Sequence, residues 1–538
     1  MALPQVLLIA AVVACALADD DARVTLEQGA VKGRKFVFLG KTVEVYLGIP
    51  YAEPPVGSLR FQKPRPAQPW TGTLDATNPK SSCIQQSMPL LGSIADTSED
   101  CLFLNVWAPA KQGPLKSVMV WIHGGAFNFG SSYQDWYNGS ALVSSEDVVV
   151  VTLNYRLGPF GFLTARTAEA PGNVGLYDQA LALQWVQANI EAFGGNRDKL
   201  TLFGESAGSM SIHAHMISPL TTGLFHRGIM MSGSLYTPGV APGVDEMLRR
   251  GNNFARHVSC ATFSKDLSTQ PDDVLKCLRS KSAEELQAGY EMFEQRFIKK
   301  FMPIFNEAFL PVAPCLAMSR GLFKKVDIMS GLTEDEGTFM FVSQPDKRIV
   351  EDNLQHISEE ELEASARSLM QSWLNEINDA RWKFHENKVD PSEWKTGYRK
   401  ASSDFVTDEL FKCPHKLLSD RLSGGDSTMF SYMFGHCSEM SPFPKWAGVP
   451  HTTDIFYFFG LPMVYPDHYT DDDRAFCKDV MKMATAFAKE GAPVLPTGEK
   501  WPKYTVEDPV SISIKAGNFT TLRGMDLKIC DHWQESTC

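Results

Sequence analysis

The chain has 538 residues, of which 44% are hydrophobic and 21% charged, and this length can bury a large core. It carries 51 Lys and Arg against 63 Asp and Glu, which gives a formal net charge of −12. Because an acidic protein repels phosphate backbones, this charge argues against nucleic acid as a partner.

Residues 1–18 are predicted to be a secretory signal peptide. They are largely apolar, and residues 16–18 offer a small-residue cleavage site. No later segment has the length and apolarity of a membrane span. Two N-glycosylation sequons begin at Asn138 and Asn518 and agree with the secretory route. We therefore expect a secreted, extracellular glycoprotein without a membrane span.

The first half of the mature chain alternates apolar, β-branched runs with segments of helical spacing. Strands are predicted at 117–122, 147–153, 200–203 and 229–233, and helices at 179–193 and 210–218. This alternation predicts an α/β fold with a mostly parallel central sheet and helices on both faces.

The second half of the chain is predicted to be more helical. Residues 359–388 are expected to form one long helix or a helix pair, and residues 470–490 another helix. No linker with a compositional break and no internal repeat interrupts the sequence. We therefore expect residues 19–538 to form a single large domain.

The most informative motif is Gly204-Glu205-Ser206-Ala207-Gly208, which lies between a predicted strand and a predicted helix. In that context the pattern indicates the nucleophile elbow of an α/β-hydrolase, with Ser206 as the nucleophile. The two glycines are needed because the sharp turn brings the backbone close to its neighbours.

A second motif, His123-Gly124-Gly125-Ala126, follows the strand predicted at 117–122. It matches the HGGG-type oxyanion motif, with alanine at its last small position. Small residues let backbone N–H groups approach the substrate oxygen, where a tetrahedral intermediate needs hydrogen-bond donors. The alternative is a plain glycine-rich turn.

A serine nucleophile also needs a base and an acid that orients it, in the chain order Ser, acid, His. Seven histidines follow far enough downstream, and His451 stands out because a turn at 448–450 precedes it. For the acid, Glu334, Asp335 and Glu336 all follow an apolar stretch, and spacing alone does not choose among them.

With these motifs in place, the chain resembles the type-B carboxylesterases, the family that includes the cholinesterases. The resemblance rests on 47–55 (LGIPYAEPP), 99–109 (EDCLFLNVWAP) and 193–199 (FGGNRDK), which are long, specific strings. It implies the α/β-hydrolase fold and the triad Ser206, Glu336 and His451. It further implies oxyanion donors at the N–H groups of Gly125, Ala126 and Ala207, and no cofactor or metal is expected.

The resemblance also implies a disulfide framework for a chain with eleven cysteines. The implied pairs are Cys83–Cys101, Cys260–Cys277 and Cys413–Cys530. Cys15 would leave with the signal peptide, and family pairing leaves Cys315, Cys437, Cys477 and Cys538 without a partner. As the final residue, Cys538 is a candidate for an interchain bridge in a homodimer, and the alternative is a free terminal thiol.

Substrate choice depends on aromatic residues that would hold a choline group by cation–π attraction. The loop between Cys83 and Cys101, where cholinesterases carry their principal choline-binding Trp, contains no Trp, Tyr or Phe. Glu205 and Phe339 match residues near the cation, and Phe297 is expected in the acyl pocket. However, Met340 and Lys299 stand where aromatic residues are expected.

The sequence thus predicts a secreted carboxylic-ester hydrolase that acts on small-molecule esters through an acyl-enzyme. A dedicated acetylcholinesterase is disfavoured, and a cholinesterase-like enzyme is the first alternative. A catalytically inert, neuroligin-like adhesion protein is the alternative from another class. The intact set of Ser206, Glu336 and His451 argues against that last alternative.

Overall fold

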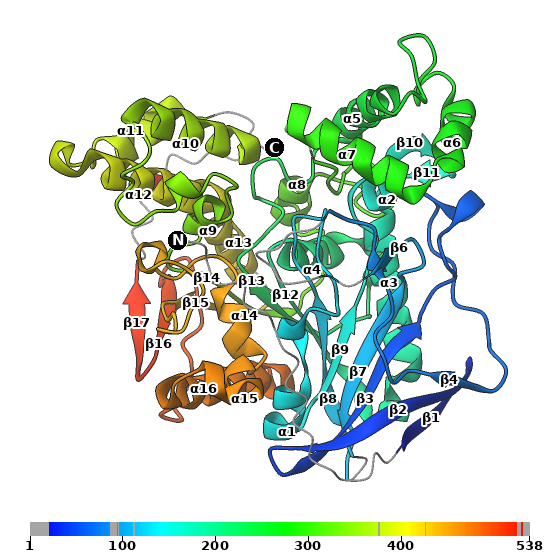
Figure 1. Cartoon of the computed structure of the whole chain (residues 1–538). Coiled ribbons are helices and arrows are strands. Elements are labelled where there is room, and N and C mark those ends of the chain that lie inside the picture. The colour runs from blue at the N-terminus through cyan, green and yellow to red at the C-terminus, as the bar shows by residue number, and fades with distance from the viewer. Residues whose placement is uncertain are drawn as a thin grey trace.

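The computed structural model describes residues 21–86, 94, 96–110, 113–297, 300–374, 377–424, 427–524 and 529–530, without the side chains of 295–297 and 373. The predicted signal peptide at 1–18, Lys299, Cys538 and the side chain of Phe297 lie outside these descriptions. Figure 1 shows the chain from blue at its N-terminus to red at its C-terminus.

A 13-stranded sheet forms the centre of the molecule, in the order β1-β2-β3-β7-β9-β8-β12-β13-β14-β15-β16-β17, with β4 beside β2. The bounds are β1 Asp21–Leu26, β2 Gly29–Phe38, β3 Lys41–Pro50, β4 Thr73–Asp75, β7 Phe103–Pro109, β8 Lys116–Ile122, β9 Val149–Leu153, β12 Gly195–Glu205, β13 Arg227–Met231, β14 Asp327–Thr333, β15 Met429–Phe434, β16 Val510–Lys515 and β17 Asn518–Arg523. All four strands predicted in the first half are present.

The sheet is mixed, and its parallel part lies in the centre. Strands β9, β8, β12, β13, β14, β15 and β16 run parallel to their neighbours in this order. Strands β1, β2, β3 and β7 at one edge and β17 at the other pair antiparallel. Short turns at 27–28, 39–40 and 516–517 join adjacent edge strands, and such turns can only make antiparallel neighbours.

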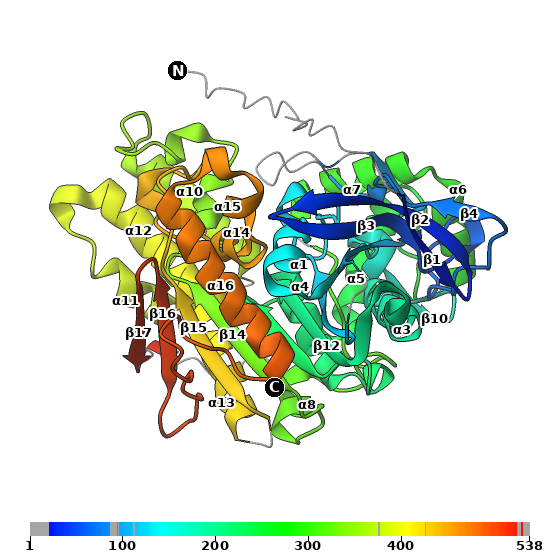
Figure 2. The ribbon, with the colours of Figure 1, turned by 90° about the horizontal axis from the view of Figure 1, so that it is seen from below.

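Successive residues of the central strands face opposite sides of the sheet, so two separate cores form. Val120 and Leu202 pack on the side of α3 (Val174–Asn189) and α4 (Ala207–Ile217). Trp121 and Phe203 pack on the other side, with α1 (Ser140–Glu146), α14 (Thr453–Phe458) and α16 (Asp471–Glu490). Figure 2 shows α16 crossing the sheet. Helices therefore cover both faces.

Two further groups of helices lie on opposite flanks of the molecule in Figures 1 and 2. One contains α5 (Val244–His257), α6 (Pro271–Ser280) and α7 (Ala283–Phe297). The other contains α9 (Thr338–Val342), α10 (Glu359–Trp373), α11 (Asp379–Glu386) and α12 (Trp394–Thr407). The segment predicted at 359–388 is thus a helix pair, α10 and α11. No helix in the described ranges is long and apolar enough to span a bilayer.

All three disulfides implied by the resemblance are formed: Cys83–Cys101, Cys260–Cys277 and Cys413–Cys530. Cys315 is also disulfide-bonded, which leaves Cys437 and Cys477 as the free cysteines of the described chain.

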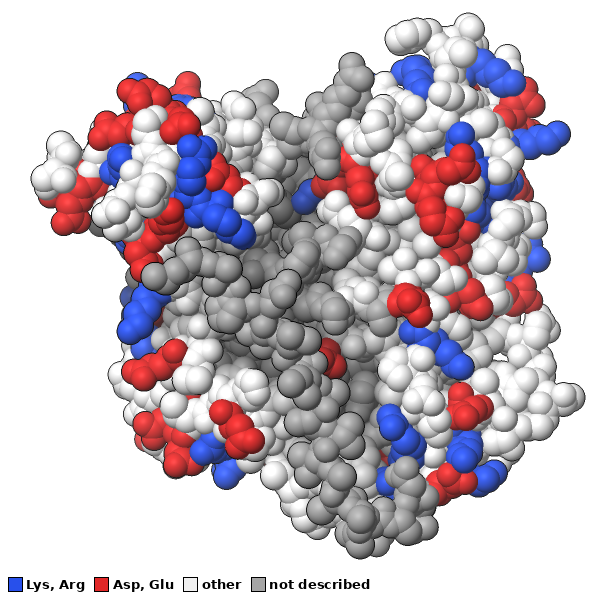
Figure 3. All heavy atoms as spheres, in the orientation of Figure 1, with Lys and Arg blue, Asp and Glu red and all other residues white. Residues whose placement is uncertain are grey.

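On the face shown in Figure 3, basic and acidic side chains are interspersed.

The two sequon asparagines differ in exposure. Asn518 begins β17 and is exposed. Asn138 is half-buried, and its side-chain oxygen accepts a hydrogen bond of 3.0 Å from the backbone of Ser140. Glycosylation needs an accessible amide, so Asn518 is the better placed of the two predicted sites.

Candidate active site

Ser206 lies in the tight turn between β12 and α4. Its backbone adopts φ 55° and ψ −120°, a left-handed φ held by a hydrogen bond of 2.8 Å from its N–H to the Met231 carbonyl. A Cβ atom at Gly208 would lie 1.9 Å from the carbonyl oxygen of Ile122, and one at Gly204 would lie 2.7 Å from the Gly208 backbone. The glycines of the motif therefore permit the turn, as predicted.

The helix after the turn begins earlier than predicted. We expected it from residue 210, but α4 already starts at Ala207. As the first helical residue, Ala207 has a backbone N–H that no intrahelical carbonyl can accept. This N–H belongs to the residue directly after the nucleophile.

His451 and Glu336 form a buried, hydrogen-bonded pair. His451 Nδ1 donates to Glu336 Oε2 at 2.6 Å. The other oxygen, Oε1, accepts from Ser232 Oγ at 2.5 Å and from the backbone N–H of Thr333 at 2.8 Å. Glu336 is fully buried, and these bonds fix its orientation.

The structure distinguishes the three carboxylates among which spacing alone could not choose the acid. Glu334 pairs with Lys515 at 2.7 Å. Asp335 accepts from the backbone N–H of Val449 at 3.0 Å, so it holds the loop that carries His451. Glu336 alone reaches the imidazole, in agreement with the resemblance.

The other side of the imidazole faces Glu205, because His451 Nε2 lies 2.9 Å from Glu205 Oε1. This is a close contact of opposite charges, and no hydrogen bond joins His451 to Ser206 in this state. Burial disfavours the charged imidazolium, but Glu205 and Glu336 outweigh that effect and raise the pKa of His451. Burial likewise raises the pKa of Glu205, while His451 opposes that rise.

Because Glu205 contacts His451, we expect the pH dependence of kcat/KM to change when Glu205 is replaced. A general base must be neutral, so kcat/KM should rise with pH as His451 loses its proton. Glu205→Gln removes one of the two negative charges that raise this pKa, and we expect the acid limb of the kcat/KM profile to move to lower pH. The profile is measured with p-nitrophenyl butyrate. A midpoint that stays in place or moves to higher pH would contradict the role given to Glu205.

The loop predicted to hold the oxyanion has an unusual backbone. Gly125, Ala126 and Phe127 have φ values of 107°, 50° and 60°. A Cβ atom at Gly125 would lie 1.9 Å from the Phe129 carbonyl oxygen, so only glycine fits there. Within the described ranges, the backbone N–H groups of Gly125, Ala126 and Ala207 have no protein acceptor. They are therefore available to a substrate oxygen.

Two side chains that sequence reasoning missed support this loop. Asn128 donates from its amide to the carbonyls of Ala126 and Phe301, and the hydroxyl of Tyr290 donates to Asn128 Oδ1. Asn128 and Tyr290 are both buried. The pair links α7 to the strained residue Ala126 across a long stretch of sequence, and no local pattern predicts such a contact.

A pocket of about 1140 Å³, its open mouth included, lies over Ser206 between the two flanking helix groups. Its aromatic walls come from several elements: Phe127, Phe129, Trp136, Tyr137, Phe339 and Phe411. The predicted residues Glu205 and Phe339 and the substituted position Met340 all line it. The ring of Phe339 lies 5.6 Å from that of His451.

Trp136 changes the expectation drawn from the Cys83–Cys101 loop. That loop lacks aromatic residues, but Trp136 in the turn Asp135–Tyr137 lines the pocket together with Glu205. The pocket therefore has an aromatic wall from a different segment. The signal in the sequence was the Trp-Tyr dipeptide shortly after the oxyanion motif.

Two more polar residues were missed near the histidine. Ser232, which donates to Glu336, directly follows β13, and a polar residue at the carboxyl end of a parallel strand is a usable signal. Asp454 is fully buried three residues after His451 and accepts from Tyr432 Oη at 3.1 Å. Burial, Glu205 and Glu336 raise the pKa of Asp454 to about 8.

The model of the carboxylesterase family matches residues 20–533, which is nearly the whole chain. The chain belongs to the carboxylesterase family.

Proposed function

We propose that this protein is a serine carboxylic-ester hydrolase. The observation that carries the proposal is the buried Glu336–His451 hydrogen bond of 2.6 Å in the same pocket as the elbow residue Ser206. Family membership supports the hydrolysis of carboxylic esters in general. The serine mechanism is our inference from the residues in the pocket.

In this mechanism Ser206 Oγ attacks the ester carbonyl while His451 Nε2 accepts the hydroxyl proton. The imidazole must first turn its Nε2 from Glu205 towards Ser206. Glu336 stabilises the imidazolium that forms, and the N–H groups of Gly125, Ala126 and Ala207 bind the oxyanion. Protonated His451 then gives its proton to the departing alcohol. Water, activated by the same histidine, releases the acid and restores Ser206.

An organophosphate tests the nucleophile directly. We expect diethyl p-nitrophenyl phosphate to release one equivalent of p-nitrophenol per protein and to leave a diethylphosphoryl group on Ser206, located by peptide mass mapping. The same sample should lose its hydrolysis of p-nitrophenyl butyrate in proportion to labelling. Labelling of a different serine, or ester hydrolysis that survives full labelling, would contradict the mechanism.

Choline esters are a second candidate substrate class, favoured by one observation. Trp136, Tyr137 and the buried carboxylate of Glu205 line the same pocket, and such a set can hold a quaternary ammonium group. A comparison of acetylthiocholine with uncharged thioesters of equal acyl length separates this candidate from a general esterase.

We further propose that the protein acts outside the cell. The three disulfides support an oxidising compartment, in line with the predicted signal peptide and the exposed sequon at Asn518.

A further inference from the structure

Arg250 is a buried cation in the wall of the substrate pocket. It lies on α5, its residue exposure is 7%, and it lines the same pocket as Ser206. A guanidinium group cannot lose its charge at ordinary pH, so burying it costs free energy unless its N–H groups and its charge are matched. The proposed reaction gives this residue no role.

The hydrogen bonds of Arg250 leave part of the guanidinium unused. Its Nε donates to Glu246 Oε1 at 2.9 Å, and its Nη1 donates to the Lys300 carbonyl at 2.6 Å. Its Nη2 group finds no acceptor anywhere in the described parts of the chain. Nη2 and the second N–H of Nη1, which lie on the same edge of the guanidinium group, are therefore the donors left for an oxygen ligand.

Arg250 does not have a carboxylate partner of its own among the described residues. Glu246 also pairs with Arg249, so one carboxylate is shared by two guanidinium groups. Lys300 lines the pocket as well, and its Nζ lies 3.8 Å from Glu294, so that pair is balanced. The other pocket carboxylate, Glu205, is engaged with His451. A bound anion is therefore the ligand that would match the charge of Arg250.

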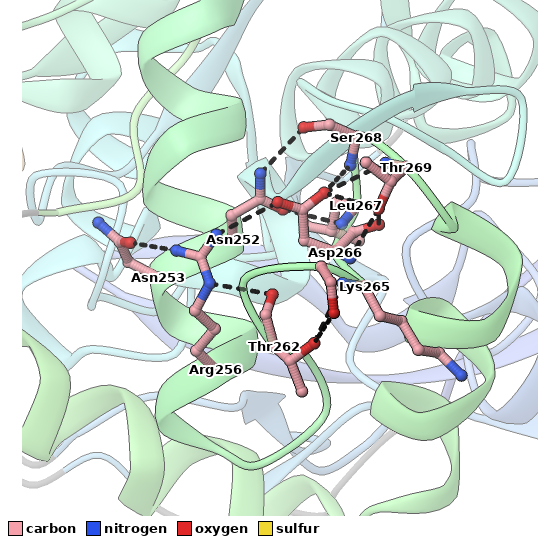
Figure 4. Close-up of polar contacts among 10 residues, drawn as sticks. Asn252, Asn253, Arg256, Thr262, Lys265, Asp266, Leu267, Ser268 and Thr269 are labelled. Carbon is pink, nitrogen blue, oxygen red and sulfur yellow. Dashed lines mark hydrogen bonds and ion pairs between the residues drawn. The ribbon is translucent and has the colours of Figure 1, made fainter.

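Polar contacts anchor α5, the helix that carries Arg250. Figure 4 shows those between the end of α5 and the loop that follows it. Asn252 accepts from the backbone of Leu267 at 2.8 Å and donates to Ser268 at 3.0 Å. Arg256 pairs with Asp266 at 3.2 Å, inside the loop closed by Cys260–Cys277. These contacts hold α5 in place without a ligand, so Arg250 is positioned before substrate binds.

We propose that Arg250 forms an anion subsite that binds a carboxylate group on the substrate. The preferred substrates would then be esters that carry a free carboxylate, in the acyl or the alcohol part, at a distance that spans the pocket from Ser206 to α5. A guanidinium edge matches a carboxylate with two parallel hydrogen bonds, which favours this anion over a spherical one. The inference rests on the proposed ester hydrolysis.

Matched pairs of esters test the subsite. For the acyl side, mono-p-nitrophenyl adipate is compared with p-nitrophenyl hexanoate. For the alcohol side, 4-acetoxybenzoate is compared with its methyl ester. In each pair we measure the ratio of kcat/KM for the anionic ester to that for the neutral ester. Arg250→Met should lower this ratio at least about tenfold in one pair, the usual loss for a hydrogen bond to a charged group.

Arg249→Met is the matched control, because Arg249 shares Glu246 but its side chain is 69% exposed. Its ratios should stay within about twofold of wild type, as for a surface ion pair. Unchanged ratios in both pairs for a folded Arg250→Met variant overturn the subsite. If the wild type hydrolyses neither the anionic nor the neutral esters, the proposed ester hydrolysis itself fails, which is a different result from unchanged ratios.

A second measurement does not depend on the folding of Arg250→Met. Adipate should competitively inhibit wild-type hydrolysis of p-nitrophenyl hexanoate, with an inhibition constant at least about tenfold lower than that of the neutral adipamide. Arg250→Lys, which keeps the charge but not the planar fork, should fall between wild type and Arg250→Met in its ester ratios. Equal inhibition by adipate and adipamide overturns the proposal.

Discussion

Replacing Ser206 with alanine is expected to lower kcat for p-nitrophenyl butyrate by about 10⁶-fold. The alanine removes the only hydroxyl that the elbow presents beside the oxyanion loop and the Glu336–His451 pair. The N–H groups of Gly125, Ala126 and Ala207 remain, so some rate above the uncatalysed reaction should persist. Steady-state rates with active-site-titrated wild type as the reference measure the loss.

The fold should survive this change. Alanine is smaller than serine, and the turn is held by the backbone bond from residue 206 to Met231 and by the close packing of Gly208. Ser144→Ala is the control, because Ser144 is a buried serine in α1 on the other face of the sheet, away from the pocket, whereas Ser206 is half-buried. A Ser206→Ala variant with near-normal turnover, or a control with an equal loss, would refute the assignment.

Glu336→Gln is expected to lower kcat by about 10⁴-fold with little change in KM. The reason is the direction of each hydrogen bond. Ser232 and the Thr333 backbone both donate to Oε1, so a glutamine must place its oxygen there. Its NH₂ group then faces His451 Nδ1, which must become an acceptor. The proton moves to Nε2, and the imidazole can no longer accept the proton of Ser206.

Glu334→Gln provides the control for Glu336→Gln. The two residues are close in sequence, but Glu334 pairs with Lys515 at the surface of the sheet edge. We expect its loss to change kcat by less than about twofold. A similar loss in both variants would show that the segment 334–336 acts through folding and not through the tautomer of His451.

The parts of the fold that follow local patterns could be predicted. The central strands β8, β9 and β12 are continuous apolar runs, because strands buried on both faces must be. The antiparallel edges were not predicted, because the outer strands β1 and β2 are buried on one face only and carry a weaker signal. Membership of the carboxylesterase family implies the α/β-hydrolase fold, and the mixed sheet is consistent with it.

The residues of the candidate site also divide into those that local motifs indicate and those that only tertiary contacts identify. Ser206 and Gly125 could be proposed from the sequence because each lies in a short motif whose backbone geometry is local. Glu336 could not be chosen from three adjacent carboxylates by spacing, since only the tertiary contact with His451 separates them. Trp136 was missed because the search for pocket aromatic residues followed a single loop.

We expect the Tyr290–Asn128 contact to couple the size of the substrate to the rate of turnover. Tyr290 lies on α7, which packs against the pocket-lining helix α5, while Asn128 holds the carbonyl of Ala126 in the oxyanion loop. We expect a bulky group that displaces α5, and with it α7, to disturb the proposed oxyanion donors as well. A larger pocket on that side and fast turnover would then be difficult to combine. Variants selected there for hydrolysis of larger esters should hydrolyse small esters more slowly.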